Sequence, residues 1–207
     1  VSELLSQDQY IDVIMPRGGK SLIKKISNES KIPVIKHLDG NCHVYIDVAA
    51  EFKTAMDCTI NSKTQRYGVC NAAESLIIHK KFPKSQTIKI LNALSEHGVK
   101  IRGCKTTKNI FKKATLANES DWYEEYLKPI ISVKIVHNID EAINHIEKYG
   151  SKHTDSIITK NKLTQRKFLR EVDSSSVMIN TSTRFADGFE YGLGAEIGIS
   201  TDKIHAR

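Results

Sequence analysis

Short apolar segments alternate with amphipathic segments along most of this 207-residue chain, and this alternation limits the fold more than any other feature. The apolar segments have the length of buried strands, whereas the amphipathic segments place apolar residues at helical spacing. We expect strands at residues 10–15, 31–36, 43–47, 75–79, 99–102, 131–136, 155–159 and 176–180. We expect helices around residues 22–26, 52–60, 88–95, 140–150 and 168–172, with Asp140 as the cap of the fourth, and a polar surface segment at 104–129. The alternation predicts an α/β fold with a mainly parallel sheet and flanking helices.

Cysteine usage and hydropathy restrict the setting of the protein. The four cysteines, Cys42, Cys58, Cys70 and Cys104, are widely spaced and form neither a CxxC motif nor a Cys/His cluster. This pattern argues against a disulfide framework and a zinc site, and it suits a reducing compartment. The sequence has no apolar run that could span a bilayer and no secretory leader, so we expect a cytoplasmic protein without membrane contact or a bound metal.

A formal net charge of +7 raises the question of nucleic-acid binding. The lysines are scattered, for example at 24–25, 80–81 and 112–113, and no basic stripe is interleaved with aromatic residues. We therefore expect a solvated lysine-rich surface and no nucleic-acid partner. A small anionic substrate would also suit the excess of positive charge.

Two stretches are candidates for chemistry. Residues 16–20 form a glycine turn between a strand pattern and a helix pattern, which can present backbone N–H groups to a phosphate. The turn lacks the full GxGxxG spacing, so a plain βα turn explains it equally well. Residues 65–74 place Cys70 after a glycine, between a helix pattern and a strand pattern.

Cys70 would be a nucleophile if its thiolate were stabilised, either by the nearby cation Arg66 or by a short helix that begins after it. The alternative is a buried structural cysteine, which is the commoner role of a lone cysteine. Taken by itself, the stretch slightly favours the structural role.

Three stretches together resemble one family. Residues 65–74 resemble the nucleophile segment of the γ-glutamyl phosphate reductases, a branch of the aldehyde dehydrogenase superfamily. Residues 136–157 are similar to that family's diagnostic segment, and residues 182–188 with 192–201 resemble its C-terminal region. The similarity covers nearly the whole chain in the right order, and it shifts the interpretation of Cys70 to a nucleophile.

The resemblance implies an aldehyde dehydrogenase-like catalytic domain in a chain of about half the family's length. Residues 1–38 would be the last portion of the NADP-binding domain, 39–180 the catalytic domain, and 181–207 a return segment towards cofactor and oligomerisation elements. We therefore expect a fragment that is inactive and binds NADPH poorly on its own, and a homo-oligomer at full length.

The reaction that the resemblance implies is the NADPH-dependent reduction of L-glutamyl 5-phosphate to L-glutamate 5-semialdehyde and phosphate, a step of proline biosynthesis. Cys70 would attack the acyl phosphate, phosphate would leave, and hydride would reduce the resulting thioester. The backbone N–H of Cys70 is one candidate donor to the oxyanion. The alternatives are another acylating aldehyde dehydrogenase that uses coenzyme A, and a basic binding module without catalysis.

The resemblance also implies the residues of the site. The substrate residues would be Arg66, Asn71 and Arg184, and the cofactor residues Arg17, Gly18, Gly19 and Glu125. A solvated or structural role is equally open for Arg66, and a salt bridge with Asp187 is the alternative for Arg184. His37 stands where hydrolytic relatives carry a glutamate that activates water, which fits an enzyme that keeps water off its thioester. A packing role explains His37 equally well.

Overall fold

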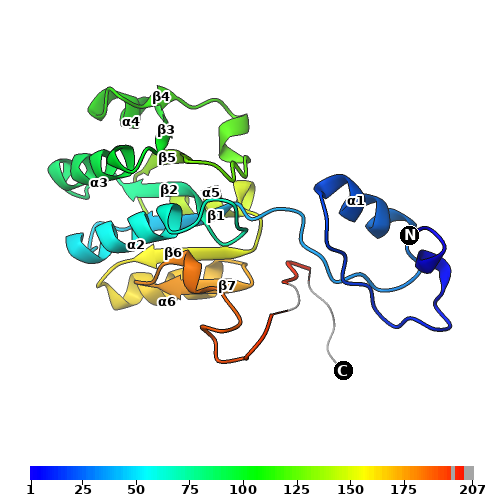
Figure 1. Ribbon diagram of the computed structural model, residues 1–207. Coiled ribbons are helices and arrows are strands. Elements are labelled where there is room, and N and C mark those ends of the chain that lie inside the picture. Colours follow the sequence, from blue (N-terminus) through cyan, green and yellow to red (C-terminus); the bar gives the residue numbers. More distant parts are fainter. Residues whose placement is uncertain (197–198, 203–207) are drawn as a thin grey trace.

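Within residues 1–196 and 199–202, which the structure describes, seven strands form one sheet in the order β4-β3-β5-β2-β1-β6-β7 (Figure 1). The structure is a computed structural model. The strands are β1 (Cys42–Ile46), β2 (Ala73–His79), β3 (Lys100–Gly103), β4 (Thr115–Leu116), β5 (Ile130–Val136), β6 (Thr154–Ile158) and β7 (Ser176–Ile179). Every pair of neighbouring strands is parallel. The predicted α/β class with a mainly parallel sheet is confirmed.

Helices cover both faces of the sheet. The described α-helices are α1 (Lys20–Glu29), α2 (Phe52–Thr64), α3 (Lys84–Glu96), α4 (Lys105–Ile110), α5 (Ile139–Tyr149) and α6 (Lys162–Glu171). Ala55 of α2 and Leu91 of α3 belong to a core with Val44 and Leu76, whereas Phe168 of α6 belongs to a core on the other face. Because both faces are covered, the central strands β1, β2 and β6 are buried along their whole length, as parallel strands are in general.

Consecutive side chains of the central strands point to opposite cores. Val44 and Ile46 pack with α2 and α3, while Tyr45 between them stacks on Phe168 with ring centroids 6.5 Å apart. The twofold alternation of a strand produces this division. This division between the two cores fixes the register of β1. Functional side chains can then lie at the ends of the strands.

The chain turns back after β7 and crosses the sheet. The Asn180 side chain donates to the Thr159 carbonyl (3.1 Å), just beyond the carboxyl end of β6. Three residues later, the Thr183 hydroxyl donates to the Asn71 carbonyl (2.7 Å), just before the amino end of β2. Residues 180–183 therefore connect the carboxyl edge of the sheet to its amino edge.

The two strands expected near the N-terminus do not form. Residues 10–15 and 31–36 share only an isolated bridge between Ile14 and Val34. Pro33 has no N–H to donate, so it prevents a longer ladder beside that bridge. In Figure 1 this segment, with the 3-10 helix η1 (Leu4–Ser6) and α1, lies apart from the sheet.

Two further expectations are corrected. Residues 104–129 are not wholly irregular, because they contain α4, β4 and the 3-10 helix η2 (Ser120–Trp122) with a buried Trp122. Asn138, and not Asp140, caps α5, since its side chain accepts the Glu141 N–H (2.9 Å). Both errors lie at element boundaries or in short elements, where periodicity is weakest.

In the part of the chain that the structure describes, none of the helices has the length and apolar character needed to cross a bilayer. The same residues contain no group of three or more His, Cys, Asp or Glu side chains that could hold a metal ion.

Candidate active site

Cys70 lies at the amino edge of β2, in the loop of residues 65–72 that follows α2 and is called here the Cys70 loop. Its side chain is half-buried, and a turn closes behind it as the Ala72 N–H donates to the Val69 carbonyl (3.1 Å). β2 begins at Ala73, directly after this turn. The short helix that the sequence left open after Cys70 does not form, so no helix N-terminus there stabilises its thiolate.

Gly40 packs its backbone directly against that of Cys70. A Cβ atom on Gly40 would lie 2.0 Å from the Cys70 carbonyl oxygen and 2.6 Å from the Cys70 Cα. The Gly40 N–H donates to Glu125 Oε1 (2.7 Å), which fixes the approach. Only glycine fits this contact. The sequence signal was weak, because Asp39-Gly40 marks only a turn and does not indicate a close approach to Cys70.

Cys42 also contacts the Cys70 loop. Its thiol donates to the Cys70 carbonyl (3.1 Å) and lies 3.8 Å from Nδ1 of His153. Both side chains are buried at the amino ends of β1 and β6. Burial and the neighbouring His37 lower the pKa of His153 to about 4, so its imidazole is neutral. Cys42 lacks the loop context of Cys70 in the sequence, and so it was assigned no role there.

The charges around Cys70 come from distant parts of the chain. Burial raises the pKa of the Cys70 thiol, and the carboxylates of Glu125 and Glu196 raise it further. The backbone N–H of Cys70 and the Arg184 guanidinium lower this pKa, but burial outweighs them. Arg184 is thus the side-chain cation that favours the thiolate, and the thiol is the resting form in this chain.

Asn71 fastens the return segment to the Cys70 loop. Its side-chain N–H donates to the Ala186 carbonyl (3.0 Å) and more weakly to the Arg184 carbonyl (3.5 Å). Thr183 in turn donates to the Asn71 carbonyl. These contacts use the Asn71 amide nitrogen within the protein, and its Oδ1 is buried without a partner among the described residues.

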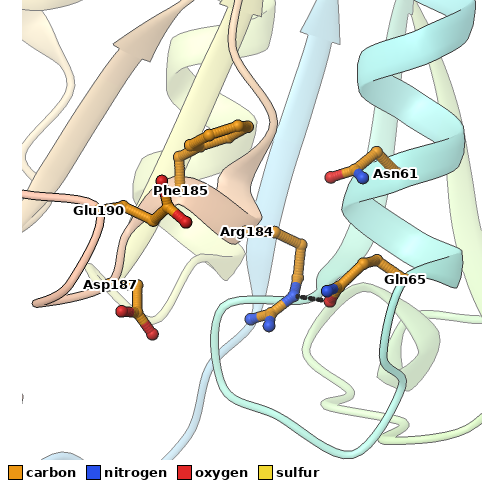
Figure 2. A pocket seen from close by; sticks show the side chains of 6 residues that line it. All are labelled: Asn61, Gln65, Arg184, Phe185, Asp187 and Glu190. Carbon is orange, nitrogen blue, oxygen red and sulfur yellow. Dashed lines mark hydrogen bonds between the residues drawn. The ribbon is translucent and has the colours of Figure 1, made fainter.

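Arg184 lines a cleft of about 210 Å³ beside the Cys70 loop (Figure 2). Its lining residues, which define the Arg184 cleft, are Asn61, Gln65, Arg184, Phe185, Asp187 and Glu190. The Arg184 Nε donates to Gln65 Oε1 (2.7 Å), a contact between residues 119 positions apart. No ion pair joins Arg184 to Asp187 within the described residues, although the Asp187 carboxylate raises the pKa of Arg184. The 3-10 helix η3 (Thr183–Phe185) holds Arg184 at this position.

Arg66 lies in the Cys70 loop with an exposed side chain. It is close enough to Arg184 to lower the pKa of that guanidinium by charge repulsion. The two arginines therefore bring positive charge to one side of the Cys70 loop, while burial and nearby carboxylates dominate at the thiol itself.

A fully buried ion pair spans the Cys70 loop. Lys63 Nζ lies 2.6 Å from Glu74 Oε2, and neither side chain is exposed to solvent. Glu74 also accepts the Leu127 N–H (3.2 Å). Burial raises the pKa of Glu74 to about 7 and lowers that of Lys63, while their mutual attraction opposes both shifts. The pair joins the last turn of α2 to the start of β2.

Replacing Lys63 with methionine should destabilise the fold strongly, by about 3–5 kcal/mol at pH 8, because Glu74 is left buried and unpaired. The folded pKa of Glu74 already exceeds its usual 4.5, so ionised Glu74 costs more stability as pH rises. The loss measured by urea denaturation should therefore be smaller at pH 5 than at pH 8.

Lys53→Met is the matched control, since Lys53 forms an exposed pair with Asp57 on the same helix. It should change the urea midpoint little. Adding Glu74→Gln to Lys63→Met should restore much of the loss. Equal effects of Lys53→Met and Lys63→Met would contradict the role given to the buried pair.

Comparison with models of known protein families finds no match. A solved structure does match: the γ-glutamyl phosphate reductase of Thermotoga maritima is 45% identical, with a TM-score of 0.96, over 100% of this chain and 50% of that chain. The chain belongs to the γ-glutamyl phosphate reductase family. The reductase of Saccharomyces cerevisiae is 37% identical, with a TM-score of 0.59, over 93% of this chain and 49% of that chain. The chain thus spans about half the length of the reductases it matches.

More distant structures share only the fold. A betaine aldehyde dehydrogenase of Staphylococcus aureus, solved in complex with NAD⁺, is 13% identical with a TM-score of 0.66, over 87% of this chain and 45% of that chain. The aldehyde dehydrogenase-like fold is confirmed. Of the third resembling stretch, Ile197 and Gly198 lie outside the described residues, as do residues 203–207 of the expected return segment.

The residues assigned to the cofactor by the reductase resemblance lie in two places. Arg17, Gly18 and Gly19 form the turn that enters α1, with Gly19 at its N-cap. Glu125 lies beside the Cys70 loop, where its mostly buried carboxylate accepts the Gly40 N–H and pairs with Lys20 (3.4 Å). Lys20 follows Gly19 directly, so this ion pair links the two places.

His37 has a defined structural contact. Its Nδ1 lies 3.2 Å from the Ile199 carbonyl oxygen, and its ring meets that of His153 edge-on at 5.8 Å. His37 therefore packs on the return segment and on the imidazole of His153, which lies next to the Cys42 thiol. These two contacts favour the packing role that the sequence left open for His37.

Proposed function

We propose that this chain is half of an enzyme that reduces L-glutamyl 5-phosphate to L-glutamate 5-semialdehyde and phosphate with NADPH, a step of proline biosynthesis. Its family membership supports the proposal. The observation that carries it is Cys70, half-buried at the edge of the sheet beside a cleft lined by Arg184. A thiol in that position can attack an activated acyl group held in the cleft.

The proposed chemistry takes place at the Cys70 sulfur. The thiol first loses its proton, which its raised pKa opposes and the Arg184 guanidinium favours. The thiolate attacks the acyl carbon, the carbon–oxygen bond to phosphate breaks, and a thioester remains on Cys70. The Cys70 N–H is a candidate donor to the oxyanion formed at that step. Reduction of the thioester then frees the semialdehyde and returns the Cys70 thiol.

NADPH would supply the hydride for that reduction. The turn at Arg17, Gly18 and Gly19 fits a cofactor phosphate, because it combines a cation with the N-terminus of α1. Glu125 fits a cofactor hydroxyl only in part, since Gly40 and Lys20 already engage its two oxygens. We accordingly assign residues 1–38 to the end of an NADP-binding domain, 39–180 to the catalytic domain and 181–207 to a return segment.

Arg66 and Asn71 would assist Arg184 in holding the substrate, Arg66 by its charge and Asn71 by tying the return segment to the Cys70 loop. Cys42, Cys58, Cys70 and Cys104 are all free thiols, which supports a cytoplasmic location. We also propose that the full-length enzyme is a homo-oligomer.

The reverse reaction tests the proposal in the full-length enzyme. NADP⁺ reduction by L-glutamate 5-semialdehyde should require inorganic phosphate, which accepts the acyl group from Cys70. Coenzyme A should not replace phosphate. Turnover with coenzyme A and none with phosphate would instead indicate an acylating aldehyde dehydrogenase of the coenzyme A type.

A further inference from the structure

The Arg184 cleft carries opposite charges on two walls. Figure 2 shows Arg184 between two walls, one with Asn61 of α2 and Gln65 at the start of the Cys70 loop, the other with Asp187 and Glu190 of the turn that follows η3. The cleft thus offers one guanidinium and two carboxylates within a volume of about 210 Å³. A ligand with a single charge would satisfy only one of these walls.

The polar groups of the cleft have capacity to bind a ligand. Gln65 takes the Arg184 Nε, and within the described residues the two terminal amino groups of Arg184 make no hydrogen bond. Asp187 uses Oδ1 for the Phe189 N–H (2.9 Å). Among the same residues, the side chains of Asn61 and Glu190 make no hydrogen bond or ion pair. Gln65 orients the guanidinium and leaves its outer edge free for a carboxylate.

We propose that the Arg184 cleft binds the α-amino acid end of the substrate, with the α-carboxylate on Arg184 and the α-ammonium on Asp187 and Glu190. A guanidinium matches a carboxylate in bidentate geometry, and paired carboxylates suit an ammonium group. The inference rests on the proposed function, because it takes Cys70 to be the site of acyl transfer. It adds the residues that select an amino acid over a simple acyl chain.

The connection between the cleft and Cys70 supports this assignment. Asn71, the neighbour of Cys70, donates to the carbonyl groups of Arg184 and Ala186 on the cleft wall. The Arg184 guanidinium also acts on the Cys70 thiol through space. One side chain therefore lies within electrostatic reach of both ends of a glutamyl group, whose acyl carbon and α-carbon are separated by two methylene groups.

A set of variants and substrates separates the two charged contacts. The aldehydes are L-glutamate 5-semialdehyde, 5-oxopentanoate without the amine, 4-aminobutanal without the carboxylate, and butanal without either. Arg184→Gln should lower kcat/KM for all four aldehydes to some extent, because Arg184 favours the Cys70 thiolate, and should lower it about 10- to 100-fold more for the two carboxylate-bearing aldehydes. Asp187→Asn with Glu190→Gln should lower kcat/KM for the two amine-bearing aldehydes only.

Arg170→Gln is the control, because Arg170 is an exposed arginine on α6 paired with Glu171. It should change none of the four values. Equal losses on all four aldehydes in Arg184→Gln would overturn the inference, since they would reveal a general effect on the Cys70 loop. No loss on any aldehyde would overturn it as well.

A binding measurement keeps the inference separate from the proposed function. L-Glutamate, glutarate and butylamine are titrated into the 207-residue chain and followed by NMR. L-Glutamate should shift the signals of the Arg184 cleft more than either single-charge probe, and Arg184→Gln should abolish the shift. If the full-length enzyme lacks phosphate-dependent turnover but L-glutamate binds as expected, the proposed function is refuted. The assignment of the Arg184 cleft to an amino acid ligand is then retained. If L-glutamate does not bind and Arg184→Gln lowers kcat/KM equally for all four aldehydes, the proposed role of the cleft is overturned, whereas the proposed reaction is not.

Discussion

Cys70→Ser should abolish phosphate-dependent NADP⁺ reduction by L-glutamate 5-semialdehyde, with a loss of at least about 1,000-fold in kcat. A serine hydroxyl ionises far less readily than a thiol, and the burial that already raises the pKa of Cys70 would oppose an alkoxide even more. Without the Cys70 thiolate, no group adds to the aldehyde, and no thiohemiacetal forms from which hydride could pass to NADP⁺. The measurement is the initial rate of NADPH formation by the full-length enzyme.

Cys58→Ser serves as the control, since Cys58 is a half-buried cysteine on α2 with no described contact to the Cys70 loop. It should retain the wild-type rate. Alkylation with iodoacetamide should inactivate the wild type in step with labelling of Cys70. Turnover near the wild-type rate in Cys70→Ser would refute the thioester mechanism.

Gly40→Ala should remove activity and destabilise the fold by about 3 kcal/mol, the upper range for an added methyl group in a packed site. The new Cβ would lie 2.0 Å from the Cys70 carbonyl oxygen and 2.6 Å from its Cα. Both atoms are backbone, so no side-chain rotation relieves the clash. The Cys70 loop must shift, and the hydrogen bond from Cys42 to the Cys70 carbonyl is lost with it. Urea denaturation and kcat measure the two effects.

Gly68→Ala is a matched control within the Cys70 loop. A Cβ on Gly68 has no atom within 4 Å, so the substitution should fold normally and keep activity. The contrast between the two variants therefore tests the close approach of the Gly40 and Cys70 backbones. It separates this effect from that of replacing any glycine near the site. A stable and active Gly40→Ala would show that the two backbones can separate without consequence.

Much of the sheet was predictable because burial on both faces leaves a local signature. Strands such as 131–136 and helices such as 88–95 appear as apolar runs or helical spacing, whatever lies next to them. The same signature was misleading at 10–15 and 31–36, where apolar runs form only the Ile14–Val34 bridge. A strand needs partners, and periodicity within one segment does not report whether partners exist.

The site was predictable in part. Cys70 stood out because it follows a helix pattern and precedes a strand pattern, but its role as a nucleophile was implied by the family resemblance, as was the substrate role of Arg184. The partners of each residue were not predictable. The cation expected to act on Cys70 was Arg66, its sequence neighbour, whereas Arg184 from the return segment acts on its pKa.

The sequence by itself determined the α/β class, the family, and the position of Cys70 before a central strand. Only the tertiary structure placed Gly40 against Cys70, Gln65 on Arg184 and a buried Lys63 beside Glu74. The physical reason is distance along the chain: periodicity reports how each segment is buried, whereas these contacts depend on which strand ends meet. The crossing of residues 180–183 from one edge of the sheet to the other brings Arg184 to the Cys70 loop.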